Sequence, residues 1–151
     1  MPALSVRQAM LSDLPVLAPL FDAYRQFYGR SPDLVAAESF LRERFNHRES
    51  VVFLAQGDSG PAGFTQLYPA FSSVSLARTF ILNDLFVVPA QRRTGVGSAL
   101  LGAAVAYARS LGAVRVTLNT DIQNTSAQAT YEARGWKRDR EFYVYHFAAQ
   151  D

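Results

Sequence analysis

A short segment with two closely spaced glycines has the residue types of an anion-binding site. Residues 91–98 read QRRTGVGS, and they follow an apolar run that ends at Pro89. Glycines at the start of a helix bring free backbone N–H groups to the positive end of the helix dipole, where phosphate binds well. The segment therefore predicts a phosphate site, with close packing at a helix start as the alternative reason for the glycines.

The residues on either side of this segment predict a strand and a helix that hold it. After the glycines, Val96, Leu100 and Ala104 are spaced as on one face of a helix, which we expect to end near Gly112. The apolar run before them predicts a strand, because Pro89 cannot donate to a sheet ladder. A Walker loop is excluded because no Gly-Lys-Ser/Thr follows, and a Rossmann fingerprint fits poorly because Leu100 occupies its third glycine position.

The remaining chain predicts a mixed α/β domain with a largely antiparallel, twisted sheet. Predicted strands cover residues 4–9, 51–55, 62–71, 75–88 and 114–118, with one or two closing strands over 136–146. We expect the strand at 114–118 to be buried and parallel to the strand at 75–88. Ser12 is the predicted cap of a first helix, and further helices are expected over 31–45, with Val35 on its apolar face, and over 124–135.

Length and composition favour one domain over residues 1–151. The chain has a net charge of +2, no cysteine and only two histidines, which excludes a thiol nucleophile and argues against a metal site. No basic block is interleaved with aromatic residues, so we expect no nucleic-acid partner. No apolar run approaches the length of a membrane-spanning helix and no signal-peptide core is present, so we expect a soluble, cytoplasmic protein with no membrane partner.

Two motifs in this order resemble the Gcn5-related N-acetyltransferase (GNAT) superfamily. The first is LxVxPxxRxxGxG over residues 85–97, and the second is NxxAxxxYExxGW over residues 124–136. The resemblance covers at least residues 75–147 and implies the GNAT fold, a mainly antiparallel mixed sheet with splayed central strands and about four flanking helices. The segments YRQFYG (24–29) and NDLFV (83–87) resemble most the small-amine acetyltransferases of the Hpa type and the diamine acetyltransferases.

The resemblance implies that the bound phosphate belongs to acetyl-CoA, a co-substrate used without a metal. Its pyrophosphate is expected on the N–H groups of residues 93–98, and its pantetheine arm along the backbone of residues 85–87, in the wedge between the strands at 83–88 and 114–119. Arg92 and Arg93 either screen the phosphates or are simply solvated. The predicted contacts are Leu85, Phe86, Val87, Arg92, Arg93, Thr94, Gly95, Val96, Gly97, Ser98, Asn124, Ser126 and Tyr131.

Acetyl transfer to an amine requires two proton transfers, for which two residues are candidates. An alkyl ammonium with a pKa of about 10.4 is neutral only about once in 2,500 molecules at pH 7, which costs about 4.6 kcal/mol. The residue that matches Asn83 is typically glutamate in diamine acetyltransferases, so we expect Asp84 to be the base or ammonium anchor, with a surface carboxylate as the alternative. Regular strand alternation points Asp84 away from Asn83, but a bulge would redirect either side chain. The superfamily implies Tyr131 as the general acid, with a packed core tyrosine as the alternative.

The acceptor is expected between the first two helices and the sheet, where Asn83 and Asp84 would also contact it. Tyr24 and Tyr28 would hold an ammonium by cation–π contact, or else pack into the core. Direct attack on the acetyl donor in a ternary complex is expected, with a small amine or amino acid favoured over a protein lysine. A non-catalytic acyl-CoA sensor is the alternative, because Asn83 cannot take a proton. Aromatic residues at 142–147 fall on both faces of a strand, which leaves a homodimer open.

Overall fold

The computed structural model describes residues 3–150, and the chain divides into two compact units, one ending at Leu118 and the other beginning at Asn119. The first unit contains a five-stranded sheet in the order β1-β2-β3-β4-β5. Its strands are β1 (Ser5–Gln8), β2 (Val51–Gly57), β3 (Gly60–Ser72), β4 (Ala77–Val87) and β5 (Arg115–Thr117). The first four strands pair antiparallel and β5 pairs parallel to β4, which confirms the predicted mixed, mainly antiparallel sheet.

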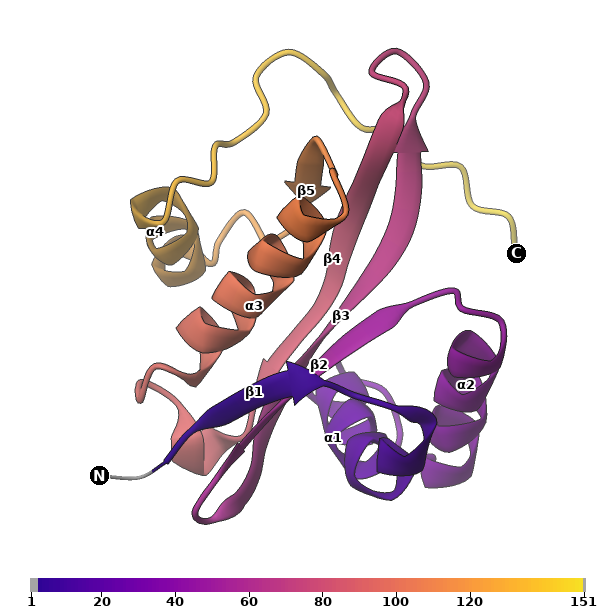
Figure 1. The fold of residues 1–151 in the computed structure, drawn as a ribbon, viewed down its shortest axis with the longest axis vertical. Coiled ribbons are helices and arrows are strands. Elements are labelled where there is room, and N and C mark those ends of the chain that lie inside the picture. Colours follow the sequence, from indigo (N-terminus) through magenta and orange to yellow (C-terminus); the bar gives the residue numbers. More distant parts are fainter. Residues whose placement is uncertain (1–2, 151) are drawn as a thin grey trace. The chain divides into compact units, whose positions relative to one another are not determined.

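Helices cover both faces of this sheet (Figure 1). A 3₁₀ turn (Leu11–Asp13) leads into α1 (Leu14–Phe27), which packs beside α2 (Leu34–Asn46), and α3 (Val96–Ser110) lies along β4 on the other face. Phe64 and Phe86 join the apolar cluster of α1 and α2, whereas Phe80 contacts Tyr107 of α3. Alternation along the strands therefore supplies apolar side chains to two helical layers.

The helix starts were predicted only in part. α2 begins at Leu34, close to the start predicted at residues 31–33, and Asp33 caps it by accepting from the N–H of Ala36. The prediction that Ser12 caps the first helix is wrong, because Asp13 holds the N-cap position of α1 and accepts from the N–H of Met10. The assignment of Val35 to an apolar helix face is also wrong, since Val35 is 82% exposed and Ala37 and Leu41 are the buried residues of α2.

A bulge in β4 sets the direction of its side chains. Gln66 lies opposite Asp84 and the next residue, Leu67, lies opposite Leu82, so Asn83 is an extra residue with no partner in β3. Without it, alternation would put Asp84 on the same face as Phe80 and Leu82. The extra residue moves Asp84 to the opposite face, where α1 packs.

The pairing between β4 and β5 is short. Its three Cα pairs join residues 79–81 to residues 115–117, and β4 continues for six residues beyond Ile81. This is the predicted splay of the central strands. The prediction that β5 is buried is wrong, because Arg115 and Thr117 are exposed. β5 lies at the edge of the described sheet and has only one neighbouring strand.

The second unit contains one helix, α4 (Thr125–Ala133), which Asn124 caps by accepting from the N–H of Ala127. The predicted closing strands over 136–146 are absent from the described part of this unit, in which residues 136–150 form no helix or strand. The alternating aromatic pattern indicates strand propensity, but a strand also needs a ladder partner for its backbone groups. The extent of a single domain over residues 1–151 stays a prediction.

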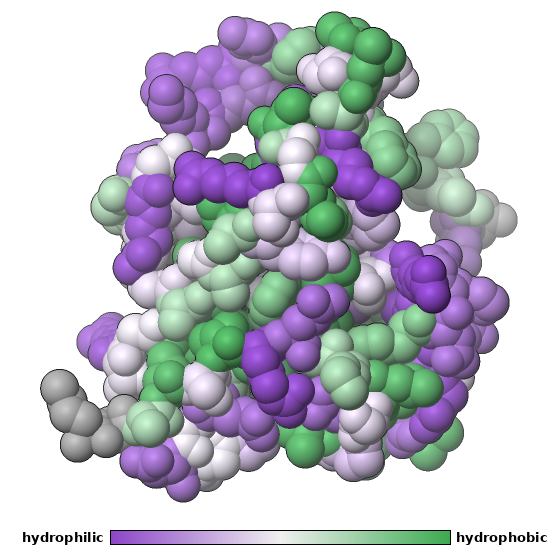
Figure 2. Space-filling model, viewed as in Figure 1, coloured by the Kyte–Doolittle hydropathy of each residue, from purple (hydrophilic) through white to green (hydrophobic). Residues whose placement is uncertain are grey.

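Hydrophobic and hydrophilic residues are interspersed around β1, α1 and α2 on the face seen in Figure 2. Within residues 3–150 every helix is too short or too polar to pass through a bilayer. The described residues also contain no cluster of three or more His, Asp or Glu side chains arranged to hold a metal ion.

Candidate functional site

Asp84 is the centre of a buried polar cluster on the α1 face of the sheet. Its side chain is 1% exposed, and its two carboxylate oxygens accept from different amides. Asn83 Nδ2 donates to Asp84 Oδ1 over 2.7 Å, and Gln66 Nε2 donates to Asp84 Oδ2 over 2.6 Å. The bulge thus brings the side chains of Asn83 and Asp84 together, as the sequence suggested for a bulged strand.

Burial raises the pKa of the Asp84 carboxyl, and the hydrogen bonds from Asn83, Gln66 and Tyr24 only partly oppose this shift. A carboxylate in an apolar environment is a stronger base than one in water, because the charged form is poorly solvated. The position, the burial and the raised pKa together make Asp84 a candidate proton acceptor.

Two tyrosines stand next to this carboxylate. Burial, followed by the negative charge of Asp84, raises the pKa of Tyr24 and of Tyr68, so both phenols are neutral at physiological pH. The hydroxyl of Tyr24 donates to the backbone carbonyl of Asn83 over 3.2 Å, at the bulge itself. Tyr24 therefore hydrogen-bonds at the bulge, and Tyr68 lies close enough to Asp84 to feel its charge.

Tyr24 and Tyr28 form an aromatic pair at the end of α1, with ring centroids 5.0 Å apart. Tyr24 is half-buried and its ring also contacts Phe64 and Phe86, so it belongs partly to the core. Tyr28 is 66% exposed. Tyr24 thus lies between the core and the Asp84 cluster, and Tyr28 extends the aromatic surface into solvent.

The splayed part of β4 leaves backbone groups that no described strand pairs. The N–H of Val88 donates to Ala62 of β3 over 2.9 Å, and backbone direction alternates along a strand. The N–H of Phe86 therefore also points to β3, while those of Leu85 and Val87 point to the edge that β5 no longer pairs. An extended ligand with amide groups could pair with this edge.

The start of α3 has the backbone geometry of an anion site. Gly95 is the N-cap with a φ of 91°, a conformation that favours glycine, and no side chain caps the helix. The N–H groups of the first turn, at Val96, Gly97 and Ser98, therefore lack a side-chain acceptor. A Cβ on Gly97 would meet the Val87 side chain at an ordinary 3.8 Å, so packing within the protein does not require this glycine.

The two arginines before this turn differ. Arg92 donates from Nε to the carbonyl of Val87 over 3.0 Å, and its guanidinium lies over the rings of Phe27 and Phe86. Arg92 thus joins the end of α1 to the end of β4, whereas Arg93 and Thr94 are exposed in the loop. A phosphate contact by either arginine stays a prediction.

Three predicted site residues lie in the second unit. Asn124 caps α4, Ser126 lies in its first turn and accepts from the Thr130 hydroxyl through its carbonyl, and Tyr131 lies near its end. The ring of Tyr131 lies 6.1 Å from that of Trp136, centroid to centroid. The first unit brings together Tyr24, Asn83 and Asp84, and the roles of the α4 residues stay predictions.

Gln66 and Tyr68 belong to the Asp84 cluster but were not singled out in the sequence. Gln66 is fully buried, and its Oε1 has no hydrogen-bond partner within residues 3–150. Both residues follow Phe64 at intervals of two in β3, so they share its face. The sequence signal for Gln66 was a polar residue at a buried position of an apolar strand. Its role can be recognised only from its contact with Asp84 on the neighbouring strand.

Comparison with known proteins matches residues 17–136 to the model of the family described as "Acetyltransferase (GNAT) family". The chain is 48% identical to the Bacillus subtilis protein called "Uncharacterized N-acetyltransferase YhfO" over 142 residues, 94% of this chain and 95% of that protein. A crystal structure of a "probable acetyltransferase" has a TM-score of 0.92 and 42% identity, covering 97% of this chain and 99% of that one. Aminoglycoside N-acetyltransferase AAC(6')-Iy, solved with CoA, shares the fold with a TM-score of 0.79 at 19% identity, over 97% and 96% of the two chains.

Proposed function

Because this chain belongs to the acetyltransferase (GNAT) family and is an acetyl-CoA-dependent N-acetyltransferase, we propose that it acetylates a small primary amine by direct attack in a ternary complex. The observation that carries the proposal is the Asp84 carboxylate, buried on the α1 face and bounded by Asn83, Gln66 and Tyr24. A thiol acyl-enzyme intermediate is excluded, since the chain has no cysteine.

Asp84 acts as the base or as the anchor of the acceptor ammonium. Its raised pKa brings its basicity closer to that of an amine in a poorly solvated site, which lowers the cost of removing the proton before attack. Asn83 keeps a contact role, because its amide orients the carboxylate and cannot accept the proton. Tyr24 and Tyr28 supply ring faces for the acceptor cation.

The residues at the end of β4 and the start of α3 fit an acyl-CoA. The uncapped first turn of α3 would hold the pyrophosphate, and the space beside Gly97 leaves its backbone accessible. Leu85 and Val87 would pair with the amides of the pantetheine arm through their outward N–H groups. When bound, acetyl-CoA supplies the acetyl thioester. Asn124 and Ser126 are proposed as further contacts, and Tyr131 as the acid that protonates the leaving thiolate.

The alternative function, a non-catalytic acyl-CoA sensor, would differ from the enzyme in lacking a working base. The substitution Asp84→Asn tests whether Asp84 is that base, and Asp58→Asn in the exposed β2–β3 turn is the matched control. We expect wild type and D58N to release CoA with some member of an amine panel, and kcat/KM to rise with pH through the pKa of Asp84. We expect D84N to have a kcat at least 100-fold below that of the wild type and to lose this rise of kcat/KM with pH, the acidic limb of the profile. Its acetyl-CoA binding should be retained.

Wild-type kcat and an unchanged acidic limb in D84N would remove Asp84 from the mechanism. Tight acetyl-CoA binding by the wild type with no CoA release for any amine or lysine peptide would instead favour the sensor. Measuring acetyl-CoA affinity by calorimetry in the same samples separates these two outcomes from misfolding.

A further inference from the structure

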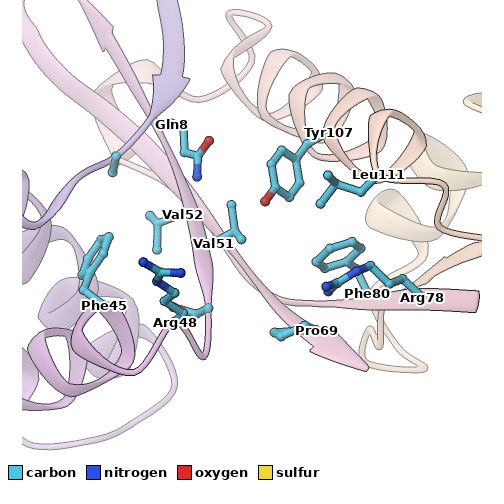
Figure 3. Close-up of a pocket in the computed structure, with 12 residues that line it drawn as sticks. Gln8, Phe45, Arg48, Val51, Val52, Pro69, Arg78, Phe80, Tyr107 and Leu111 are labelled. Atoms are coloured by element: carbon cyan, nitrogen blue, oxygen red, sulfur yellow. The ribbon is translucent and has the colours of Figure 1, made fainter. Parts of the chain in front are cut away.

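A cavity of about 420 Å³ lies in the first unit where β2 begins. Figure 3 shows Arg48, which follows α2, and Arg78 of β4 approaching this space from opposite sides, with Tyr107 of α3 above it. Gln8, at the end of β1, also faces it. The cavity exists because β2 starts at Val51, opposite Leu67, whereas β3 and β4 extend further as a hairpin.

This cavity is distinct from the proposed acyl-transfer site. Its contribution from β4 comes from Arg78 and Phe80, and Asp84 lies four residues further along the strand, about 13 Å at the usual rise per residue. None of the residues assigned to acetyl-CoA or to the acceptor lines it. A ligand here would therefore leave the acetyl-transfer residues free.

The polar lining of the cavity consists of groups that can donate hydrogen bonds, with no carboxylate among them. It includes the guanidiniums of Arg48 and Arg78, the amide of Gln8 and the hydroxyls of Ser50 and Tyr107. No ion pair joins Arg48 or Arg78 to a carboxylate within residues 3–118, and the guanidinium of Arg78 lies over the ring of Phe71. Two uncompensated positive charges at one cavity favour an anionic ligand.

Ser50 adds an independent observation. Its Oγ is buried and has no hydrogen-bond partner within residues 3–150. A buried hydroxyl without a partner is unfavourable, so the side chain gains from an acceptor brought into the cavity. A ligand carboxylate supplies that acceptor as well as the charge that the arginines lack.

The chain turn after α2 fixes the position of Arg48. Arg48 has a φ of 54°, and the neighbouring N–H of Glu49 donates to the carbonyl of Arg44 over 2.9 Å. This left-handed residue closes the helix end and carries its guanidinium to the rim of the cavity. The backbone that carries the Arg48 side chain is therefore set by the end of α2.

The other walls of the cavity are apolar, and they include Ala9, Phe45, Val51, Val52, Phe80 and Leu111. A space of this volume holds a small organic molecule, and an inorganic phosphate would leave these walls without contacts. We propose that the cavity binds a small organic carboxylate with an apolar body, its carboxylate facing Arg48, Arg78 and Ser50 and its body facing the apolar walls.

The test uses the full-length protein and four probes: benzoate, hexanoate, benzylamine and inorganic phosphate. We expect at least one of the two carboxylates to raise Tm and to bind in calorimetry, with benzylamine and phosphate at least tenfold weaker. R48Q and R78Q are each expected to weaken carboxylate binding at least tenfold, and S50A to weaken it severalfold. R115Q, on exposed β5 outside the cavity, is the control and should leave it unchanged.

The proposal is wrong if neither carboxylate binds at millimolar concentration, or if benzylamine or phosphate binds as tightly as the carboxylates. Unchanged carboxylate affinity in folded R48Q and R78Q also overturns it, as does an equal loss in R115Q. Acetyl-CoA affinity is measured in every variant and should stay at the wild-type value, which distinguishes loss of this cavity from loss of the fold.

Discussion

The carboxylate of Asp84 accepts hydrogen bonds from two side-chain amides that arrive from different strands. Asn83 is its neighbour in β4 and Gln66 is its cross-strand partner in β3. Each amide donates to one oxygen, so the carboxylate is held in one orientation while burial raises its pKa. We therefore predict that Gln66 is a positioning residue, which would act on the acceptor only through Asp84.

Replacing Gln66 with leucine tests this positioning role. Q66L removes a donor that stabilises the charged form of Asp84, so the pKa of Asp84 should rise further and the acidic limb of kcat/KM should move to higher pH. Q56L, at the end of β2, is the matched control. A fall in activity at every pH with the limb unmoved would show that Gln66 has only a structural role.

Tyr131 is expected to protonate the leaving thiolate. Y131F should lower kcat tenfold or more and leave acetyl-CoA affinity nearly unchanged, because the substitution removes the proton-donating hydroxyl and keeps the ring. Y145F serves as the control, since Tyr145 lies in the same unit and is 90% exposed. Steady-state kinetics with calorimetry separates kcat from binding, and full activity in Y131F would reject the role.

At the level of elements, the proposed donor site consists of the end of β4 and the start of α3. The bulge directs the backbone N–H groups of residues 85 and 87 away from β3, and the pairing with β5 ends at Ile81, before it reaches them. The left-handed N-cap at Gly95 leaves the first turn of α3 without a side-chain cap. Arg92 ties the end of β4 to the end of α1. The proposed donor and acceptor sites thus share one strand.

Gly97 and Gly102 provide a matched pair on α3. A Cβ at Gly97 would meet the Val87 side chain at an ordinary distance, and a longer side chain would extend into the space assigned to the pyrophosphate. Gly102 is exposed, with nothing near its Cβ position. G97L should raise the acetyl-CoA Kd at least tenfold with Tm retained, and G102L should leave Kd unchanged. Leucine is the better helix former, so neither change should unfold α3. Equal Kd values in the two variants would contradict the placement.

At the level of the molecule, a bidentate ion pair fastens the first strand to the first helix. Arg7 of β1 donates to both carboxylate oxygens of Asp13, over 2.9 Å and 2.7 Å, and Asp13 also accepts from the N–H of Met10. The hydrogen bonds from Arg7 and then Met10 lower the pKa of Asp13 to about 2. Asp13 therefore stabilises the folded state in its charged form.

The pH dependence of stability follows from this lowered pKa. The contribution of Asp13 is complete above its unfolded pKa of about 3.8 and is lost as pH falls through about 2. D13N should reduce the free energy of unfolding by about 1 kcal/mol at pH 7, because solvent screens the partly exposed pair, and by much less near pH 2. Urea titrations at both pH values measure the difference, and an equal loss at both would exclude the ion pair as its source.

Periodicity and turn residues predicted most of the elements. The glycine-opened helix, the strands at 51–55 and 62–71, and the helices expected over 31–45 and 124–135 agree with the structure because their signals are local. The prediction that Ser12 caps the first helix was wrong, because the N-cap is the next residue, Asp13, which accepts hydrogen bonds from Arg7 and from the N–H of Met10. The prediction of closing strands over 136–146 was wrong, because alternating side chains indicate that a segment can form a strand but do not identify the strand with which it would pair.

The sequence by itself determined the family, the donor and the α/β class, because glycines, caps and hydrophobic periods act over a few neighbouring residues. It also placed Asp84 and Asn83 among the candidates. Only the tertiary structure decided that Asp84 faces α1 beside Gln66, Tyr24 and Tyr68. The physical reason is the bulge: whether a strand carries an extra residue depends on its pairing with another strand, and one residue of register sends a side chain to the opposite face.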